Sequence, residues 1–145
     1  MSEDTTLRIE RVIDASPDAV FRAWTTREAI EHWYRDGDAF LARVTELDLR
    51  VGGSYRIEFG PAGQDPFVEY GTYLEIRPPH RLVMTETLEG VERPWAGTRV
   101  TVELREDGGK THVTLTHEGF PSRGHRDAAA GGWPGFLDRI ESLLR

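Results

Sequence analysis

The most constraining part of this sequence is the segment from Arg43 to Glu118, where strand patterns and turns follow one another with no helical pattern between them. Apolar and polar residues alternate in Tyr55–Phe59 and most clearly in Thr98–Arg105. The residues Glu106–Gly109 are typical of a hairpin turn. Because parallel strands need a long crossover, usually a helix, we expect six or seven consecutive strands to form an antiparallel meander.

One short strand pattern and two helical patterns precede this segment. Leu7–Ile13 alternates as a short first strand, and Ser16-Pro17 supplies the N-cap and the first position of a helix. Thr25 and Glu28 have the spacing of a capping box, which predicts a second short helix that carries Trp33 inward.

An amphipathic pattern ends the chain. Its apolar stripe consists of Phe136, Leu137, Ile140, Leu143 and Leu144. Gly131-Gly132 and Pro134 are poor interior helix residues, so we expect a kink or a fresh helix start near Trp133. The basic residues of Arg123–Arg126 predict a solvated turn. This order predicts an α+β fold in which one strongly curved sheet wraps around a long C-terminal helix, with room for a cavity between them.

The composition excludes several classes of protein. A chain of 145 residues without a linker or repeat is expected to form one domain over residues 1–145. The absence of cysteine excludes disulfides, thiolate nucleophiles and cysteine-ligated metals. A net charge of −7 argues against nucleic-acid partners. Met1–Asp4 leads into no apolar stretch, and no window approaches the ~20 apolar residues of a membrane span, so we expect a cytoplasmic protein without membrane insertion.

Known catalytic and cofactor motifs are also missing. The five histidines show no metal-ligand spacing, and Gly52-Gly53 lacks the context of a phosphate-binding loop. No serine has the surroundings of a nucleophile elbow. We therefore expect no metal and no cofactor, and we assign no catalytic residue.

Five stretches of the chain resemble one known superfamily. They are Ala15–Thr25, Asp48–Tyr55, Gly71–Val83, Thr114–Pro121 and Gly132–Ile140. In this order they resemble the SRPBCC or START-like proteins, whose helix-grip fold is also called Bet v 1-like. More narrowly, they resemble the branch named after the C-terminal domain of the activator of the Hsp90 ATPase. The resemblance implies a deep, mostly apolar pocket under the C-terminal helix.

Two titratable residues are expected to face the interior. Glu86 shares its strand phase with Leu82 and Met84, and His117 shares its phase with Val113 and Leu115. Such a pair could orient a polar ligand group or act as base and acid. Alternatively, each side chain simply pairs with a neighbour at the end of its strand.

Aromatic residues supply the other candidates, since tyrosine and tryptophan combine an apolar body with one polar group. Most of the aromatic residues are expected to be ordinary core, and Trp33 and Tyr34 are candidates for the lip of the pocket. The residues predicted to bind ligand are Trp33, Tyr55, Tyr73, Glu86, Trp95, His117, Trp133 and Phe136.

The expected function is binding of a small hydrophobic or amphipathic molecule between the sheet and the C-terminal helix. One alternative is a cyclase- or hydrolase-type enzyme that uses the same pocket, which requires Glu86 and His117 to lie close together. Another is a stress-related or chaperone-accessory protein that acts through its surface. A homodimer that covers an exposed apolar patch is a further alternative.

Overall fold

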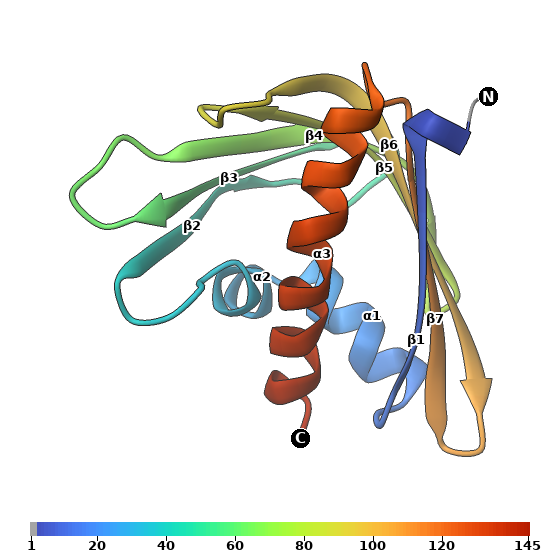
Figure 1. The fold of residues 1–145 in the computed structure, drawn as a ribbon. Coiled ribbons are helices and arrows are strands. Elements are labelled where there is room, and N and C mark those ends of the chain that lie inside the picture. Colours follow the sequence, from blue (N-terminus) through green and yellow to red (C-terminus); the bar gives the residue numbers. More distant parts are fainter. Residues whose placement is uncertain (1–2) are drawn as a thin grey trace.

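Seven antiparallel strands form one sheet in the order β1-β7-β6-β5-β4-β3-β2 (Figure 1). The strands are β1 Thr6–Ile13, β2 Phe40–Leu47, β3 Ser54–Pro61, β4 Phe67–Arg77, β5 Arg81–Glu89, β6 Trp95–Asp107 and β7 Lys110–Glu118. This computed structural model describes residues 3–145. Met1 and Ser2, on which the expectation about the start of the chain partly rests, lie outside these residues. The meander from β2 to β7 confirms the predicted six consecutive strands, and β1 adds to β7 as the seventh.

Two short helices connect β1 to β2. They are α1, Pro17–Thr25, and α2, Arg27–Trp33. Ser16 caps α1 as predicted, because its hydroxyl accepts a hydrogen bond from the Ala19 N–H at 3.2 Å. The predicted capping box is wrong. Thr25 is buried inside α1, where its hydroxyl donates to the Phe21 carbonyl at 2.9 Å, and the residue before α2 makes no side-chain cap.

The C-terminal helix α3, Arg123–Leu143, begins ten residues earlier than the position near Trp133 that the sequence suggested. Pro134 lies inside it without ending it. A proline removes one backbone hydrogen bond, whereas burial of Ala129, Trp133 and Leu137 on one face holds the helix together across that position. Arg123–Arg126 is therefore the first turn of this helix and not a separate turn, and Ser122 caps it by accepting from the His125 N–H at 3.3 Å.

Helix α3 crosses the concave face of the sheet (Figure 1). Polar contacts hold its second half in place. Arg11 of β1 lies 2.6 Å from Asp138 and 3.2 Å from Glu141. Arg139 donates to the main-chain carbonyl of Trp33, at the end of α2, at 2.8 Å. In the first half of α3, the small residues Ala128, Ala129 and Gly132 border a cavity instead.

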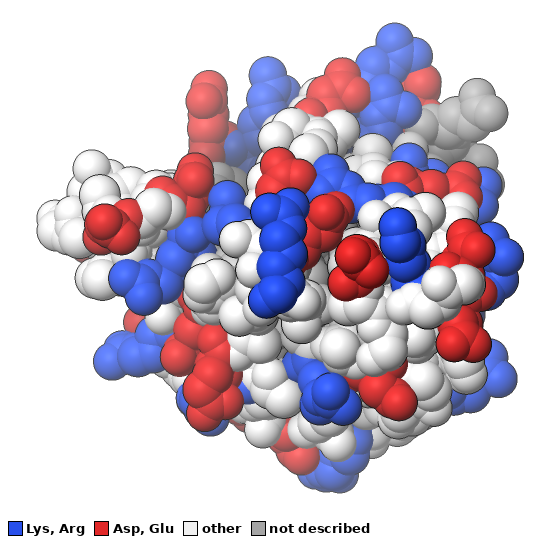
Figure 2. Space-filling model, turned by 90° about the horizontal axis from the view of Figure 1, so that it is seen from below, with Lys and Arg blue, Asp and Glu red and all other residues white. Residues whose placement is uncertain are grey.

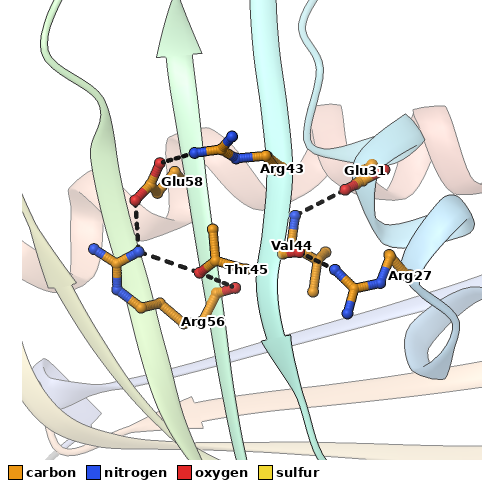
Figure 3. A network of polar contacts seen from close by, with 7 residues as sticks. All are labelled: Arg27, Glu31, Arg43, Val44, Thr45, Arg56 and Glu58. Carbon is orange, nitrogen blue, oxygen red and sulfur yellow. Dashed lines mark hydrogen bonds and ion pairs between the residues drawn. The ribbon is translucent and has the colours of Figure 1, made fainter.

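The edge strand β2 is covered by α2 (Figure 3). Glu31 accepts a hydrogen bond from the Val44 N–H at 2.9 Å, and Arg27 donates to the carbonyl of the same residue. The outer face of β2 and β3 carries an ion-pair chain in which Glu58 lies 2.6 Å from Arg56 and 3.2 Å from Arg43. The bonds from Arg27 and Glu31 satisfy the two backbone groups of Val44, which an uncovered edge would leave free.

Charged side chains of both signs are interspersed on the face seen in Figure 2. This face shows no large patch of a single sign of charge. Within residues 3–145, none of the helices is long and apolar enough to cross a membrane.

Candidate functional site

Glu86 and His117 both point into the interior, as their strand phases predicted. Glu86 is 5% exposed and His117 is fully buried. His117 Nε2 lies 3.6 Å from Glu86 Oε1. The two side chains are therefore close enough for the enzymatic alternative, and the protonation state of His117 decides what they can do together.

Both ring nitrogens of His117 are already engaged. Trp133 donates its indole N–H to Nδ1 at 3.1 Å, which places the imidazole proton on Nε2. Nε2 lies 2.9 Å from the Thr98 hydroxyl, which donates its own proton to the main-chain carbonyl of Glu86 at 2.7 Å. Burial lowers the pKa of His117 to about 3, so the ring is neutral. Its 3.6 Å approach to Glu86 is accordingly not an ion pair.

A second buried carboxyl, Glu69 of β4, completes the polar centre. In the sheet register Glu69 pairs with Leu88, so Glu86 is its diagonal neighbour on the same face. The Glu69 and Glu86 carboxyls interact, and each shifts the pKa of the other. The Tyr34 hydroxyl donates to Glu69 Oε2 at 2.7 Å, and the Trp95 indole donates to Glu86 Oε1 at 3.1 Å.

Burial dominates the titration of this carboxyl pair. It raises the pKa of Glu69 to about 7, and burial together with the neighbouring Glu69 charge raises the pKa of Glu86 well above its usual range. Two adjacent buried carboxyls share one proton rather than ionise together. Near neutral pH the pair therefore carries at most one negative charge.

The carboxyl pair lines a cavity between α3 and the sheet. This outer cavity has a volume of about 190 Å³. Its aromatic walls are Tyr34, Phe59, Phe67, Trp95, Trp133 and Phe136. Ala128, Ala129 and Gly132 of α3 and Val91 of the β5–β6 loop also line it. The small residues of α3 leave the space that larger side chains would fill.

A smaller inner cavity of about 20 Å³ adjoins the same carboxyls. It shares four residues with the outer cavity, namely Tyr34, Glu69, Glu86 and Trp133. Its volume is about that needed for one water molecule. The two cavities are therefore neighbours on either side of the carboxyl pair.

Seven of the eight predicted residues line one or both of these cavities. Trp95 and Phe136 line the outer cavity, Trp33, Tyr55 and Tyr73 line the inner one, and Glu86 and Trp133 line both. His117 lines neither, and contacts the site through Trp133 and Thr98.

Sequence reasoning missed Glu69 as a site residue and placed Tyr34 only at a lip. Tyr34 is 3% exposed and bonded to Glu69. The signal for Glu69 was present, because it shares the inward phase of Tyr73 along the same strand. The small residues of the first half of α3 were missed because the helix was expected to start later.

A larger hollow lies elsewhere, beside β2 and β3, with a volume of about 620 Å³. Charged side chains contribute much of its lining, including Glu31, Arg35, Arg43 and Glu58. Arg43 and Glu58 are paired with each other. This open groove lacks the aromatic enclosure of the outer cavity. Residues 3–145 contain no group of three or more side chains placed to hold a metal ion.

A curved antiparallel sheet, a C-terminal helix across its concave face and two short helices after the first strand define a helix-grip protein. Residues 14–145 match the family described as activator of Hsp90 ATPase homolog 1-like protein. The match spans most of the chain, which therefore belongs to this family.

Solved bacterial structures share the fold over nearly the whole chain. A protein of Chromobacterium violaceum is 28% identical, with a TM-score of 0.85 and 97% of each chain covered. A protein of Rhizobium loti is 28% identical, with a TM-score of 0.79 and coverage of 97% of this chain and 96% of that one. An AHSA1-like protein of Aeromonas hydrophila is 26% identical, with a TM-score of 0.76 and coverage of 94% and 90%. No curated protein matches the chain significantly.

Proposed function

We propose that this protein binds a small hydrophobic or amphipathic molecule between the curved sheet and α3. The observation that carries the proposal is the outer cavity of about 190 Å³, with aromatic walls and a carboxyl pair in its lining. Ligand sites are typically concave and mostly apolar, with a few polar groups that fix orientation. An apolar cavity of about 150 Å³ is enough to bind benzene, so the volume suits a molecule built around one or two small rings.

The proposed roles follow the position of each side chain. Trp95, Trp133 and Phe136 contact the apolar part of the ligand, and Glu86 with Glu69 orients its polar group. Trp33, Tyr55 and Tyr73 enclose whatever part reaches the inner cavity. His117 is a positioning residue, because it holds the indole of Trp133 through a hydrogen bond.

An enzyme that uses the same pocket is the second candidate, favoured by the 3.6 Å between Glu86 and His117. The hydrogen bonds of His117 argue against it. Both nitrogens have partners and the ring is fully buried, so the imidazole is not free to exchange a proton with a substrate. Binding therefore explains the arrangement better than catalysis.

Native mass spectrometry of the protein purified from its own host tests the proposal. We expect an additional mass that disappears after extraction with organic solvent. Titration with 2-phenylethanol, a neutral one-ring probe, then gives a direct binding measurement by calorimetry and by the fluorescence of the pocket tryptophans.

Glycines of α3 offer a matched pair of variants for this titration. Gly132 lines the outer cavity and Gly131 does not, and a Cβ at either position meets no atom within 4 Å. We expect Gly132→Leu to weaken 2-phenylethanol binding at least about tenfold, since filling the pocket displaces the ring. Gly131→Leu should bind as the wild type does. Ala129→Leu, at a buried pocket position, provides a second filled pocket. Unchanged binding in both filled variants, or no binding to the wild type, would contradict the proposal.

A further inference from the structure

We propose that the ligand of this pocket is a small amphipathic amine, bound with its ammonium group against the Glu69 and Glu86 carboxyls and its apolar part against the aromatic walls. The inference rests on the proposed function and specifies the chemistry of the molecule that the pocket takes. Three features of the site lead to it: an excess of hydrogen-bond acceptors, a lack of compensating cations and the apolar enclosure.

The acceptor capacity of the carboxyl pair exceeds the donors that the protein supplies. Tyr34 donates to Glu69 and Trp95 donates to Glu86. The Tyr55 hydroxyl also interacts with Glu69, but its proton is donated to the main-chain carbonyl of Thr85 at 2.7 Å. Four carboxyl oxygens therefore have lone pairs to spare. A ligand that brings several donors and no acceptor complements them, and an ammonium group has that property.

No cation of the protein compensates the charge of the pair. The described residues that line the two cavities include no lysine and no arginine. The polar side chains that face the pair from the surrounding elements are Tyr34, Tyr55, Tyr73, Trp95, His117 and Trp133. All are uncharged, because burial raises the pKa of Tyr34 and Tyr55 well above the usual range and lowers that of His117. A buried negative charge without a counter-ion is costly, and a bound ammonium removes that cost.

The remaining walls select against a purely polar amine. Apolar and aromatic side chains make up most of the outer cavity, so burial of a ring or short alkyl group supplies affinity that an ion such as ammonium lacks. An anionic ligand is disfavoured, because its charge would repel the charge that the pair already carries.

The protonation of the pair gives this inference a pH dependence. Glu69 loses its proton around pH 7, so the pair is neutral at pH 5.5 and holds a negative charge at pH 8. An alkylamine remains protonated across this range, as lysine does. The affinity for an amine should therefore rise between pH 5.5 and pH 8, whereas that for a neutral alcohol should stay nearly constant.

Calorimetry with three probes that share a phenyl ring and a two-carbon chain tests the inference: 2-phenylethylamine, 2-phenylethanol and 3-phenylpropionate. At pH 8 we expect the amine to bind at least about tenfold tighter than the alcohol, and the carboxylate to bind more weakly than both. The double variant Glu69→Gln/Glu86→Gln should bring the amine and the alcohol to similar affinity. A control, Glu103→Gln/Glu106→Gln, removes two exposed carboxylates of β6 and should leave the preference intact.

The outcomes separate this inference from the proposed function. If the alcohol binds the wild type as tightly as the amine at pH 8, the amine inference is wrong and the pocket proposal stands. If none of the three probes binds, both are wrong. Circular dichroism establishes whether the double glutamine variant folds. Should it not fold, the wild-type titration still decides, because an amine affinity that does not change between pH 5.5 and pH 8 overturns the inference.

Discussion

At the scale of single residues, the Glu69 side chain makes the folded protein hold a proton that the unfolded chain releases. Its pKa rises from 4.5 to about 7 because the carboxyl is buried. The native state therefore binds more protons than the unfolded state between these values, and stability falls as the pH rises through that window. We expect Glu69→Gln to gain stability relative to the wild type, on the order of 3 kcal/mol more at pH 8 than at pH 5.

Urea unfolding at both pH values, followed by tryptophan fluorescence, measures this difference. The exposed Glu103 of β6 provides the control, since Glu103→Gln removes a carboxylate outside the cavities. A Glu69→Gln variant whose stability relative to the wild type is the same at pH 5 and pH 8 would show that the buried carboxyl does not retain its proton.

The residue scale also shows what a sequence can reveal about the site. Alternation along each strand was enough to turn Glu86 and His117 inward. It could not show that Glu69 lies diagonally beside Glu86, because that contact depends on the register between β4 and β5 and on a shift in their pairing. The tautomer of His117 depends on Trp133 and Thr98, which lie on two other elements. Partners of this kind are fixed only by the assembled fold.

At the scale of elements, α2 protects the exposed edge of the sheet. Arg27 and Glu31 bond to the two backbone groups of Val44 in the edge strand β2 (Figure 3). We expect the variant Arg27→Ala/Glu31→Ala to lose about 1–2 kcal/mol of stability and to self-associate, because free edge groups pair with other chains. Chemical unfolding and size-exclusion chromatography over a range of concentrations measure the two effects.

Arg22 and Glu28 give the matched control for the Arg27 and Glu31 contacts with Val44. Both are exposed on the same pair of helices, and Arg22→Ala/Glu28→Ala removes one charge of each sign without touching β2. If the Arg27→Ala/Glu31→Ala variant is as stable and as monodisperse as this control, the Val44 contacts contribute nothing to edge protection.

Element boundaries were predictable where a local signal decided them. Ser16-Pro17 located the start of α1, and the turn residues 106–109 located the β6–β7 hairpin. The start of α3 was missed because Gly131, Gly132 and Pro134 weaken a helix locally, while the burial that stabilises this one comes from the sheet and α2. In this segment local propensity disfavours a helix, whereas tertiary packing stabilises one.

At the scale of the whole molecule, α3 is anchored by polar contacts along its second half and borders the outer cavity with its first half. Polar contacts tie the second half of α3 to β1 and α2, so the helix remains anchored although small residues leave space under its first half. A void deprives its lining of packing contacts, and glycine inside a helix costs up to about 1 kcal/mol relative to alanine. The most stable version of this fold would therefore be one without the cavity.

The Gly132→Leu and Gly131→Leu variants separate these two contributions. Both replace a helical glycine, so both should gain up to about 1 kcal/mol from helix propensity. Only Gly132→Leu adds apolar contacts within the cavity, and we expect it to melt several degrees higher than Gly131→Leu. Thermal melts with added 2-phenylethanol complete the comparison: the probe should raise the melting temperature of the wild type and of Gly131→Leu, but not that of Gly132→Leu. Equal melting temperatures for the two variants would mean that the cavity imposes no cost, and the family fold would then hold an open pocket without sacrificing stability.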